Sequence, residues 1–339
     1  MTTVSFQNAC LKEVPDLTAI PYEVVNLRGN RLRSLQGLPR TIKELDVSFN
    51  SLYSDTLDDP LILLERLSIH HNHLCIPSTG EFLLLYPMLK FLDISCNSLQ
   101  VVGFLRDSQI EELLVSRNKL HLLSALPLTL KKLVADTNTI NMIQSKLPPL
   151  LESMDVSYNL LRFAGLPLSW PMALKELHLD HNRIEKFPRK LPDSLEILTL
   201  NENRITELPK KLPEQLRVFS VSSNRIRFLP NYKSHKKFQV FLINDNCLTE
   251  IPQNTHATVF SAEENWTTQD HATAQTILKR CWKRHVITLR LRHIVRTQVY
   301  KEELFMVSMM PERWDQVDVL DPVWFRKGQD HNRTGHLRD

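Results

Sequence analysis

One asparagine, repeated at near-constant spacing, constrains the fold of this chain more than any other feature. Apolar residues usually stand five and three positions before it, as Leu177 and Leu179 do before Asn182, and often eight positions before it as well. The pattern LxxLxLxxN recurs eleven times at intervals of 20 to 25 residues, on Asn30, Asn50, Asn72, Asn97, Asn118, Asn138, Asn159, Asn182, Asn203, Asn224 and Asn246. A period of this length is typical of a repeat protein.

The repeat predicts a solenoid. Alternating apolar positions in a short strand point to one side, so parallel strands stacked about 4.8 Å apart would bury a continuous column of leucines. The asparagine side chain would then hydrogen-bond backbone groups that the turn leaves buried. Prolines such as Pro188, Pro209 and Pro230 fall between the strands, where extended backbone needs no ladder hydrogen bonds. Only the longer unit between Asn72 and Asn97 has room for a helical turn.

These units resemble the leucine-rich repeat family, and the form LPxxLxxLxLxxNxIxxLP is most similar to repeats of secreted bacterial effectors and of proteins from large DNA viruses. The resemblance implies an α/β solenoid, a horseshoe with a parallel sheet on its concave face and a helix-poor convex side. We expect this domain to span residues 1–255, with a degenerate capping unit at 11–15. A basic helical segment or cap and a polar tail would span 256–339.

A segment near the C-terminus resembles the final part of giant-virus proteins and favours a viral origin. The residues that carry this resemblance are Glu303, Leu304, Pro311 and Arg313.

The residue seven positions before each asparagine changes sign from one unit to the next. The row runs Glu23, Lys43, Glu65, Lys90, Glu111, Lys131, Glu152, Lys175, Glu196, Arg217 and Gln239. Neighbouring strands place these side chains next to one another, where opposite charges attract and like charges repel. We therefore expect a ladder of ion pairs that fixes the register, with recognition of a partner as the alternative role.

Positions six and four before the asparagine should face outward on the concave side. They are mixed and charged in the middle of the chain, as at Glu112, Lys132 and Glu176, and become apolar toward its end. The candidate partner-binding patch consists of Ile197, Thr199, Val218, Ser220, Val240 and Leu242. An exposed apolar strip is uncommon unless something covers it. Either a protein partner or the C-terminal segment would cover it, or the strip has no special role.

The C-terminal segment contains a predicted basic amphipathic helix. Seven Lys or Arg and no acid stand between Lys279 and Arg296, and Lys279, Arg280, Trp282, Lys283 and Arg284 form its candidate contact set. Three interpretations stay open: a cap on the last repeat, a calmodulin-type target related to a degenerate IQ motif, or a nucleic-acid or acidic-membrane contact.

The sequence favours a protein without catalytic activity, cofactor or metal. It has no Walker loop, GxSxG, HExxH or paired-cysteine motif, and the tail cysteine, Cys281, lacks the CxD acid of effector ubiquitin ligases. The cluster His70-His71-Asn72-His73, with Cys75 nearby, fits a solvated turn better than a metal site. The five scattered cysteines predict reduced thiols in small apolar spaces rather than disulfides.

The sequence therefore predicts a scaffold that binds a protein partner through the concave face, as a monomer and in the cytoplasm, for instance as a viral factor that engages host proteins. No segment has the length and apolar content of a signal peptide or membrane span. The alternative is a structural component packed within a larger assembly or virus particle.

Overall fold

The computed structural model describes residues 2–54, 60–75, 81–144, 146–232, 238–251 and 257–265. Their strands are β1 (Thr3–Ser5), β2 (Val24–Asn26), β3 (Glu44–Asp46), β4 (Arg66–Ser68), β5 (Phe91–Asp93), β6 (Glu112–Leu114), β7 (Leu122–Leu123), β8 (Lys132–Val134), β9 (Met142–Ile143), β10 (Ser153–Asp155), β11 (Glu176–His178), β12 (Ile197–Thr199), β13 (Val218–Ser220), β14 (Val240–Leu242) and β15 (Val259–Ser261). The helical elements are α1 (Glu81–Leu85) and the short 3₁₀ helices η2 (Gly103–Leu105) and η3 (Phe163–Gly165).

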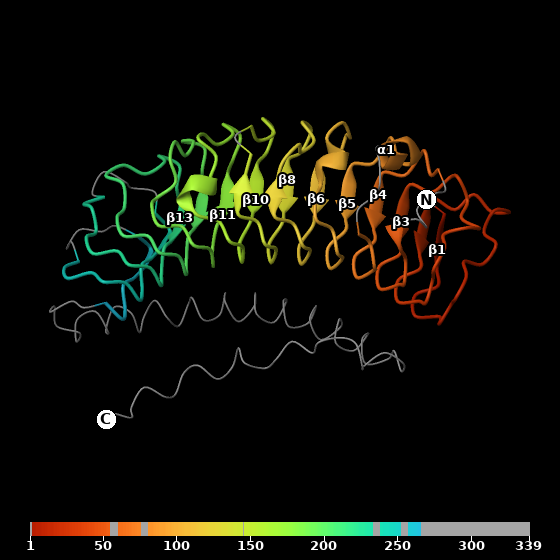
Figure 1. Cartoon of the computed structure of the whole chain (residues 1–339), viewed down its shortest axis with the longest axis horizontal. Helices are drawn as coiled ribbons and strands as arrows, with labels where there is room; N and C mark the ends of the chain where they lie inside the picture. The colour runs from red at the N-terminus through yellow and green to blue at the C-terminus, as the bar shows by residue number, and fades with distance from the viewer. Residues whose placement is uncertain are drawn as a thin grey trace, which may run out of the picture. The chain divides into compact units, whose positions relative to one another are not determined.

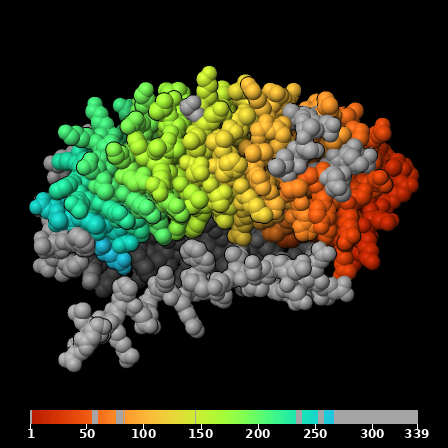
Figure 2. Space-filling model, viewed as in Figure 1, coloured from red at the N-terminus to blue at the C-terminus, as the bar shows by residue number. Residues whose placement is uncertain are grey.

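Thirteen of these strands form one parallel sheet in chain order, as Figure 1 shows. Each strand has three residues, and it pairs in register with the next, so that Leu177 faces Leu198 and Leu198 faces Phe219. The surface of the described residues also follows chain order from red through yellow and green to blue (Figure 2). The parallel solenoid predicted from the repeat is therefore confirmed for the described residues.

The middle residue of each strand and the residue two positions after it point into the core. Leu177 and Leu179 are fully buried, as are Leu198 and Leu200. Toward the C-terminal end the middle position becomes aromatic, and Phe219 stacks on Phe241 at 5.2 Å between ring centroids. The apolar residues five and three positions before each asparagine thus form the column expected from their spacing.

The repeated asparagines, which we call the ladder asparagines, join each turn to the one before it. In the buried side chain of Asn182, Nδ2 donates to the carbonyl of Val156 in the preceding turn at 3.0 Å and to that of Leu179 in its own turn at 3.2 Å. Its Oδ1 accepts the N–H of Leu161, again from the preceding turn, at 2.9 Å. One amide group therefore satisfies backbone groups that burial would otherwise leave without partners.

The residue before each of these asparagines, and also before Asn265, adopts a left-handed backbone. Positive φ angles occur at Gly29, Phe49, His71, Cys96, Arg117, Thr137, Tyr158, His181, Glu202, Ser223, Asp245 and Glu264. A single left-handed residue turns the chain sharply at the end of a strand, although it costs most residues other than glycine about 1 kcal/mol or more. The repeated turn thus relies on the asparagine contacts to hold a backbone that few of these residues favour.

The structure differs from the predicted place of the N-terminal cap and from the predicted C-terminal boundary of the repeat domain. The first strand is β1, and residues 11–15 belong to the return segment of that first turn, where the N–H of Leu11 donates to Asn30 Oδ1. At the other end β15 pairs with β14 beyond residue 255, and Asn265 makes the same carbonyl contacts as the other ladder asparagines. The 256–339 unit predicted to follow the repeats therefore begins with a further turn of the solenoid.

The return side of the solenoid holds little regular structure. The helical turn expected in the longest unit is α1, and β7 pairs with β9 in a separate two-stranded sheet that the sequence did not predict. Gly165 in η3 lies so close to the carbonyl oxygen of Asn141 that a side chain there would overlap it. The helix-poor return side is thus confirmed.

The predicted row of alternating charges forms ion pairs between neighbouring turns. Each pair joins an acid to the base of the following turn: Glu23–Lys43, Glu65–Lys90, Glu111–Lys131, Glu152–Lys175 and Glu196–Arg217, at 2.6 to 3.7 Å. These side chains are substantially exposed, so water and salt weaken each pair. The row supports the register that the buried asparagines set.

Replacing Asn182 with alanine should lower the free energy of unfolding by about 2–3 kcal/mol, because it leaves the Leu161 N–H and several carbonyls buried without partners. The midpoint of urea unfolding, followed by circular dichroism, measures this change. Asn141→Ala is the matched control because the Asn141 side chain is exposed. Equal midpoints for the two variants would contradict the structural role of the asparagine.

Thr137→Gly should stabilise the protein by about 1 kcal/mol, because Thr137 is β-branched and has a φ of 55° that glycine adopts freely. Thr139→Gly should instead lower the stability, because Thr139 is outside the left-handed region and its hydroxyl donates to the Leu120 carbonyl. Thermal unfolding of both variants measures the difference. Both variants lose a hydroxyl hydrogen bond, Thr137 to Asp136 Oδ2 and Thr139 to the Leu120 carbonyl, so an equal fall in melting temperature for the two variants would contradict this expectation.

Candidate functional site

The outward side of the large sheet is the candidate site, and we call it the sheet face. Each turn contributes three residues to it: the first and the third residue of the strand, and the residue two positions after the strand ends. This last residue contacts the third residue of a neighbouring strand, as Asp180 contacts Thr199. The middle strand residues are buried beneath it except at the ends of the stack. Its chemistry is therefore set by three residues in every turn.

The predicted patch occupies two rows of this face: Ile197, Val218 and Val240 are the first residues of their strands, and the partly exposed Leu242 lies with Thr199 and Ser220 in the row of third residues. Ile197 pairs with Val218 and Val218 with Val240, and all three are partly exposed. The structure adds Val259, which pairs with Val240 on β15. The four side chains, which we call the apolar strip, form a continuous row over the aromatic core residues Phe219 and Phe241.

The polar members of the predicted patch bond to neighbouring turns. Ser220 is buried, and its hydroxyl donates to Asn201 Oδ1 at 2.7 Å. The hydroxyl of Thr199 donates to Asp180 Oδ2 at 2.5 Å. We predicted that Ser220 is exposed on the surface, but it is buried because its hydroxyl bonds to Asn201.

A second hydrogen-bonded ladder runs along the edge of this face. Asp180 Oδ1 accepts the N–H of Asn201, Asn201 Oδ1 accepts the N–H of Ser222, and Asn244 Oδ1 accepts the N–H of Glu263. The N–H of Asn244 in turn donates to the hydroxyl oxygen of Ser222 at 3.1 Å. Burial raises the pKa of Asp180 while the bonds from Thr199 and Asn201 oppose the rise. This ladder fixes the surface beside the apolar strip.

The set His178, Thr199 and Asp180 contains the residue types of a nucleophile, a base and an acid, but its hydrogen bonds run in the wrong direction for catalysis. Nδ1 of His178 lies 3.0 Å from Thr199 Oγ1. The hydroxyl gives its one proton to Asp180, so His178 must donate to that oxygen rather than accept from it. The arrangement therefore binds the turns together and does not activate a nucleophile.

The histidine cluster, which we expected to be a solvated turn, lies nearer the N-terminal end of the sheet, and the rings of His70 and His71 pack against Phe49. His71 stacks on Phe49 at 4.1 Å between ring centroids, and the guanidinium of Arg28 lies over the Phe49 ring at 4.7 Å from its centroid. Nδ1 of His70 lies 2.8 Å from Nδ1 of His71. Burial, followed by the nearby positive groups of His70, Arg117 and Arg28, lowers the pKa of His71 from 6.5 to about 3.

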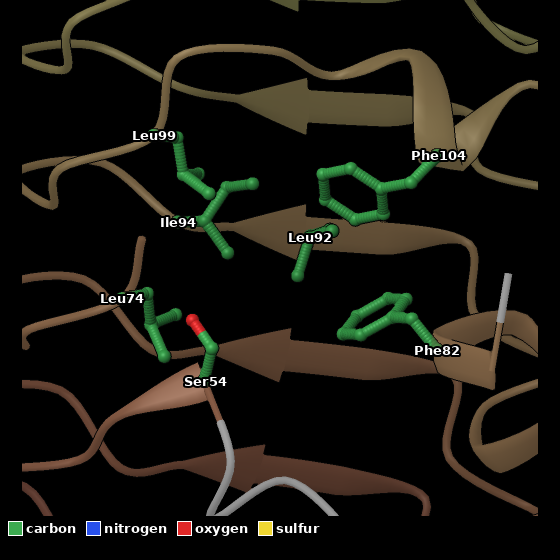
Figure 3. A pocket seen from close by; sticks show the side chains of 7 residues that line it. All are labelled: Ser54, Leu74, Phe82, Leu92, Ile94, Leu99 and Phe104. Atoms are coloured by element: carbon green, nitrogen blue, oxygen red, sulfur yellow. The ribbon is translucent and has the colours of Figure 1, made fainter. Parts of the chain in front are cut away.

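One small cavity lies inside the solenoid near α1 and η2. Figure 3 shows Phe82 and Phe104 on one side of Leu92, with Leu74, Ile94, Leu99 and Ser54 completing its lining. The two phenyl rings meet edge to face at 5.6 Å. Its volume of about 10 Å³ is no more than a single water needs, so this cavity cannot hold a substrate.

Other predicted features give no site in the described residues. There, His, Cys, Asp and Glu side chains form no group of three that could hold a metal ion. No helix of the described ranges could cross a membrane. Cys10 and Cys75 are exposed rather than in apolar spaces as we predicted, and both are free thiols. The tail set Lys279, Arg280, Trp282, Lys283 and Arg284 lies outside the described residues.

The repeated turn, the asparagine contacts and the parallel sheet define a leucine-rich repeat solenoid. No protein-family model matches the chain. Solved structures similar to it include the leucine-rich repeat domain of APL1B, with 20% identity and a TM-score of 0.63 over 78% of this chain and 82% of that one. The effector YopM from Yersinia pestis gives 24% identity and 0.54, over 78% and 88%.

A third similar structure is a chain in the octameric complex of latrophilin 3, Unc5D and the leucine-rich repeat part of FLRT2. It has 21% identity and a TM-score of 0.55 over 77% of this chain and 84% of that chain. At these identities the similarity shows the fold alone. The chain thus has the leucine-rich repeat fold that its sequence predicted.

Replacing His71 with asparagine should reduce the loss of stability in acid. Because the pKa of His71 in the folded protein lies below its ordinary value of 6.5, the unfolded chain takes up this proton first, and stability falls as the pH drops through 6.5 toward 3. His71→Asn keeps a residue that tolerates the left-handed backbone and should remove about 1 kcal/mol of the loss between pH 7 and pH 5, allowing for partial exposure.

Urea unfolding at the two pH values measures that difference, with His121→Asn as control because His121 is exposed. If His71→Asn and wild type lose stability equally on acidification, the neutral buried imidazole is not the cause.

Proposed function

We propose that this chain is a non-enzymatic scaffold that binds a protein partner through the sheet face, with the apolar strip as the centre of the contact. The observation that carries the proposal is the row Ile197, Val218, Val240 and Val259, four branched apolar side chains in register on the outward side of a sheet. Such a row is uncommon on a surface without a binding role.

The rigidity of the strip supports the same proposal. The strip lies over buried aromatic residues, and the hydroxyls beside it bond to neighbouring turns, so little conformational freedom is lost when a partner binds. The leucine-rich repeat part of FLRT2, in the complex with latrophilin 3 and Unc5D, has the same fold. A broad row of partly exposed side chains suits a macromolecule better than a small molecule, which usually binds in a concave pocket.

We further propose that the chain acts in the cytoplasm and derives from a large DNA virus. The free thiols among the described residues agree with a reducing compartment. The sequence resemblance at Glu303, Leu304, Pro311 and Arg313 supports the origin. The fold also resembles that of the effector YopM. Packing within an assembly would instead require broad contact over both sides of the solenoid.

Val218→Glu should abolish capture of the partner. A buried, unpaired carboxylate in the centre of an interface costs several kcal/mol, which lowers affinity by at least about a hundredfold. Wild-type and variant chains carrying an affinity tag would be purified from infected or expressing cells, and the bound proteins compared by mass spectrometry at matched amounts.

Met172→Glu is the control, since Met172 is 77% exposed and lies in the loop before β11, away from the sheet face. If both variants fail to capture a protein, that protein binds elsewhere or its binding depends on the general stability of the chain. If Val218→Glu still captures it, the apolar strip is not its binding site. Light scattering of the purified chain would separately test whether it is a monomer.

A further inference from the structure

The sheet face is strongly acidic although the chain as a whole carries a net charge of +4. Among the described residues the face has nine carboxylates, Glu44, Asp46, Asp93, Glu112, Asp136, Asp155, Glu176, Asp180 and Glu263, against the three bases Arg28, Arg66 and Lys132. Nine negative charges less three positive charges leave an excess of six. The basic residues of the chain therefore lie elsewhere, and this surface has its own electrostatic character.

The excess is greatest in the middle of the sheet. From β5 to β11 six carboxylates stand against Lys132 alone. Near the N-terminal end the guanidinium of Arg66 lies over the ring of Phe91 at 4.0 Å, and that of Arg28 lies over Phe49. Positive charge is thus concentrated away from the apolar strip and negative charge toward it.

These carboxylates are not neutralised by ion pairs within the described ranges. The ion pairs there join the row seven positions before the asparagines, or join His181 to Glu202, and none includes a carboxylate of the sheet face. Glu176 accepts a hydrogen bond from Ser153, and Asp155 accepts one from the N–H of Ser157. Neither of these two hydrogen bonds comes from a positively charged group.

The acidic surface and the apolar strip meet between two neighbouring strands, β11 and β12. Glu176 on β11 pairs with Ile197 on β12, the first residue of the strip. At about 4.8 Å per strand, the strip spans about 14 Å, and the surface from β6 to β15 spans about 34 Å. An α-helix of about 20 residues is about 30 Å long and covers most of that length.

We propose that the sheet face binds a cationic amphipathic segment of a partner protein, whose apolar side chains lie on the strip and whose Lys or Arg side chains lie on the carboxylates of β6 to β11. The proposal rests on the proposed function and names the chemistry of the partner. Negative potential over this face opposes nucleic acid and anionic membranes, which need a positive surface. It favours a polypeptide that combines positive charge with apolar side chains.

The test measures binding of labelled 20-residue peptides to the full chain by fluorescence anisotropy. In the first peptide a single helical face carries lysines along one half of its length and leucines along the other half, the second peptide replaces every lysine with glutamate, and the third is a shuffled form of the first that lacks this face. We expect the first to bind, with affinity that falls as salt rises, and the other two to bind at least about tenfold more weakly.

The double variant Asp155→Asn with Glu176→Gln should weaken binding of the first peptide about tenfold, because it removes two charges while the amide oxygens can keep the bonds from Ser157 and Ser153. The matched control is Asp193→Asn with Glu214→Gln, two exposed acids in the loops before β12 and β13. Equal affinity for both double variants, or equal binding of the glutamate peptide, would overturn the proposal.

The failures of the two proposals can be told apart. If Val218→Glu abolishes partner capture while the Asp155/Glu176 variant leaves peptide affinity unchanged, the protein-binding function stands and the cationic partner falls. If neither variant has an effect, both fall. If replacing Lys279, Arg280, Lys283 and Arg284 with glutamine raises peptide affinity, the occupant is this chain's own basic sequence, which overturns the assignment to a partner.

Discussion

The hydrogen bonds of the ladder asparagines are the constraint on which the rest of the structure depends. Each buried amide joins two successive turns and satisfies backbone groups that no water can reach, as Asn182 does for Leu161 and Val156. The same contacts hold the preceding residue in a left-handed conformation that most side chains disfavour. Because the amide needs carbonyls from two turns at fixed positions, it sets the register of the strands, whereas apolar packing alone would tolerate a shift. The leucine column supplies most of the burial, and the asparagine determines how the turns are aligned.

This alignment converts a periodic sequence into rows of defined chemistry. Residues at equal distance from the asparagine lie side by side, so the surface can be read row by row along the chain. The exposed row of alternating acids and bases forms pairs such as Glu152–Lys175, while the next outward row changes from charged residues in the middle to Ile197, Val218 and Val240 near the end. The core beneath them changes much less. The outward residues can therefore change with the partner while the asparagines and the inward residues keep the fold.

The periodic features could be predicted from sequence, and the features that depend on single turns could not. Eleven asparagines, the buried apolar pairs and the ion-pair row follow from spacing alone. The last turn was missed because Asn265 follows Asn246 after only 19 residues, a shorter interval than any between the eleven asparagines, although it occupies the same structural position. The buried state of Ser220 and the ladder from Asp180 to Glu263 depend on which polar residues happen to stand opposite each other in adjacent turns. The acidity of the sheet face was visible in the sequence, but only residue by residue, since the net charge of the chain has the opposite sign.

The two parts of the sheet face would act at different stages of the proposed binding. Coulomb attraction acts over about 8–10 Å at ordinary salt, so the carboxylates from β6 to β11 would influence the approach and orientation of a cationic segment before any side chains touch. The apolar strip acts only on contact, and the lifetime of the complex would depend mainly on how much of Ile197, Val218, Val240 and Val259 the partner covers. Since Glu176 pairs with Ile197, a segment oriented by its charges arrives with its apolar residues beside the strip in only one of its two possible directions. The order of acidic and apolar turns along the solenoid would thereby select the direction of the bound segment as well as its composition.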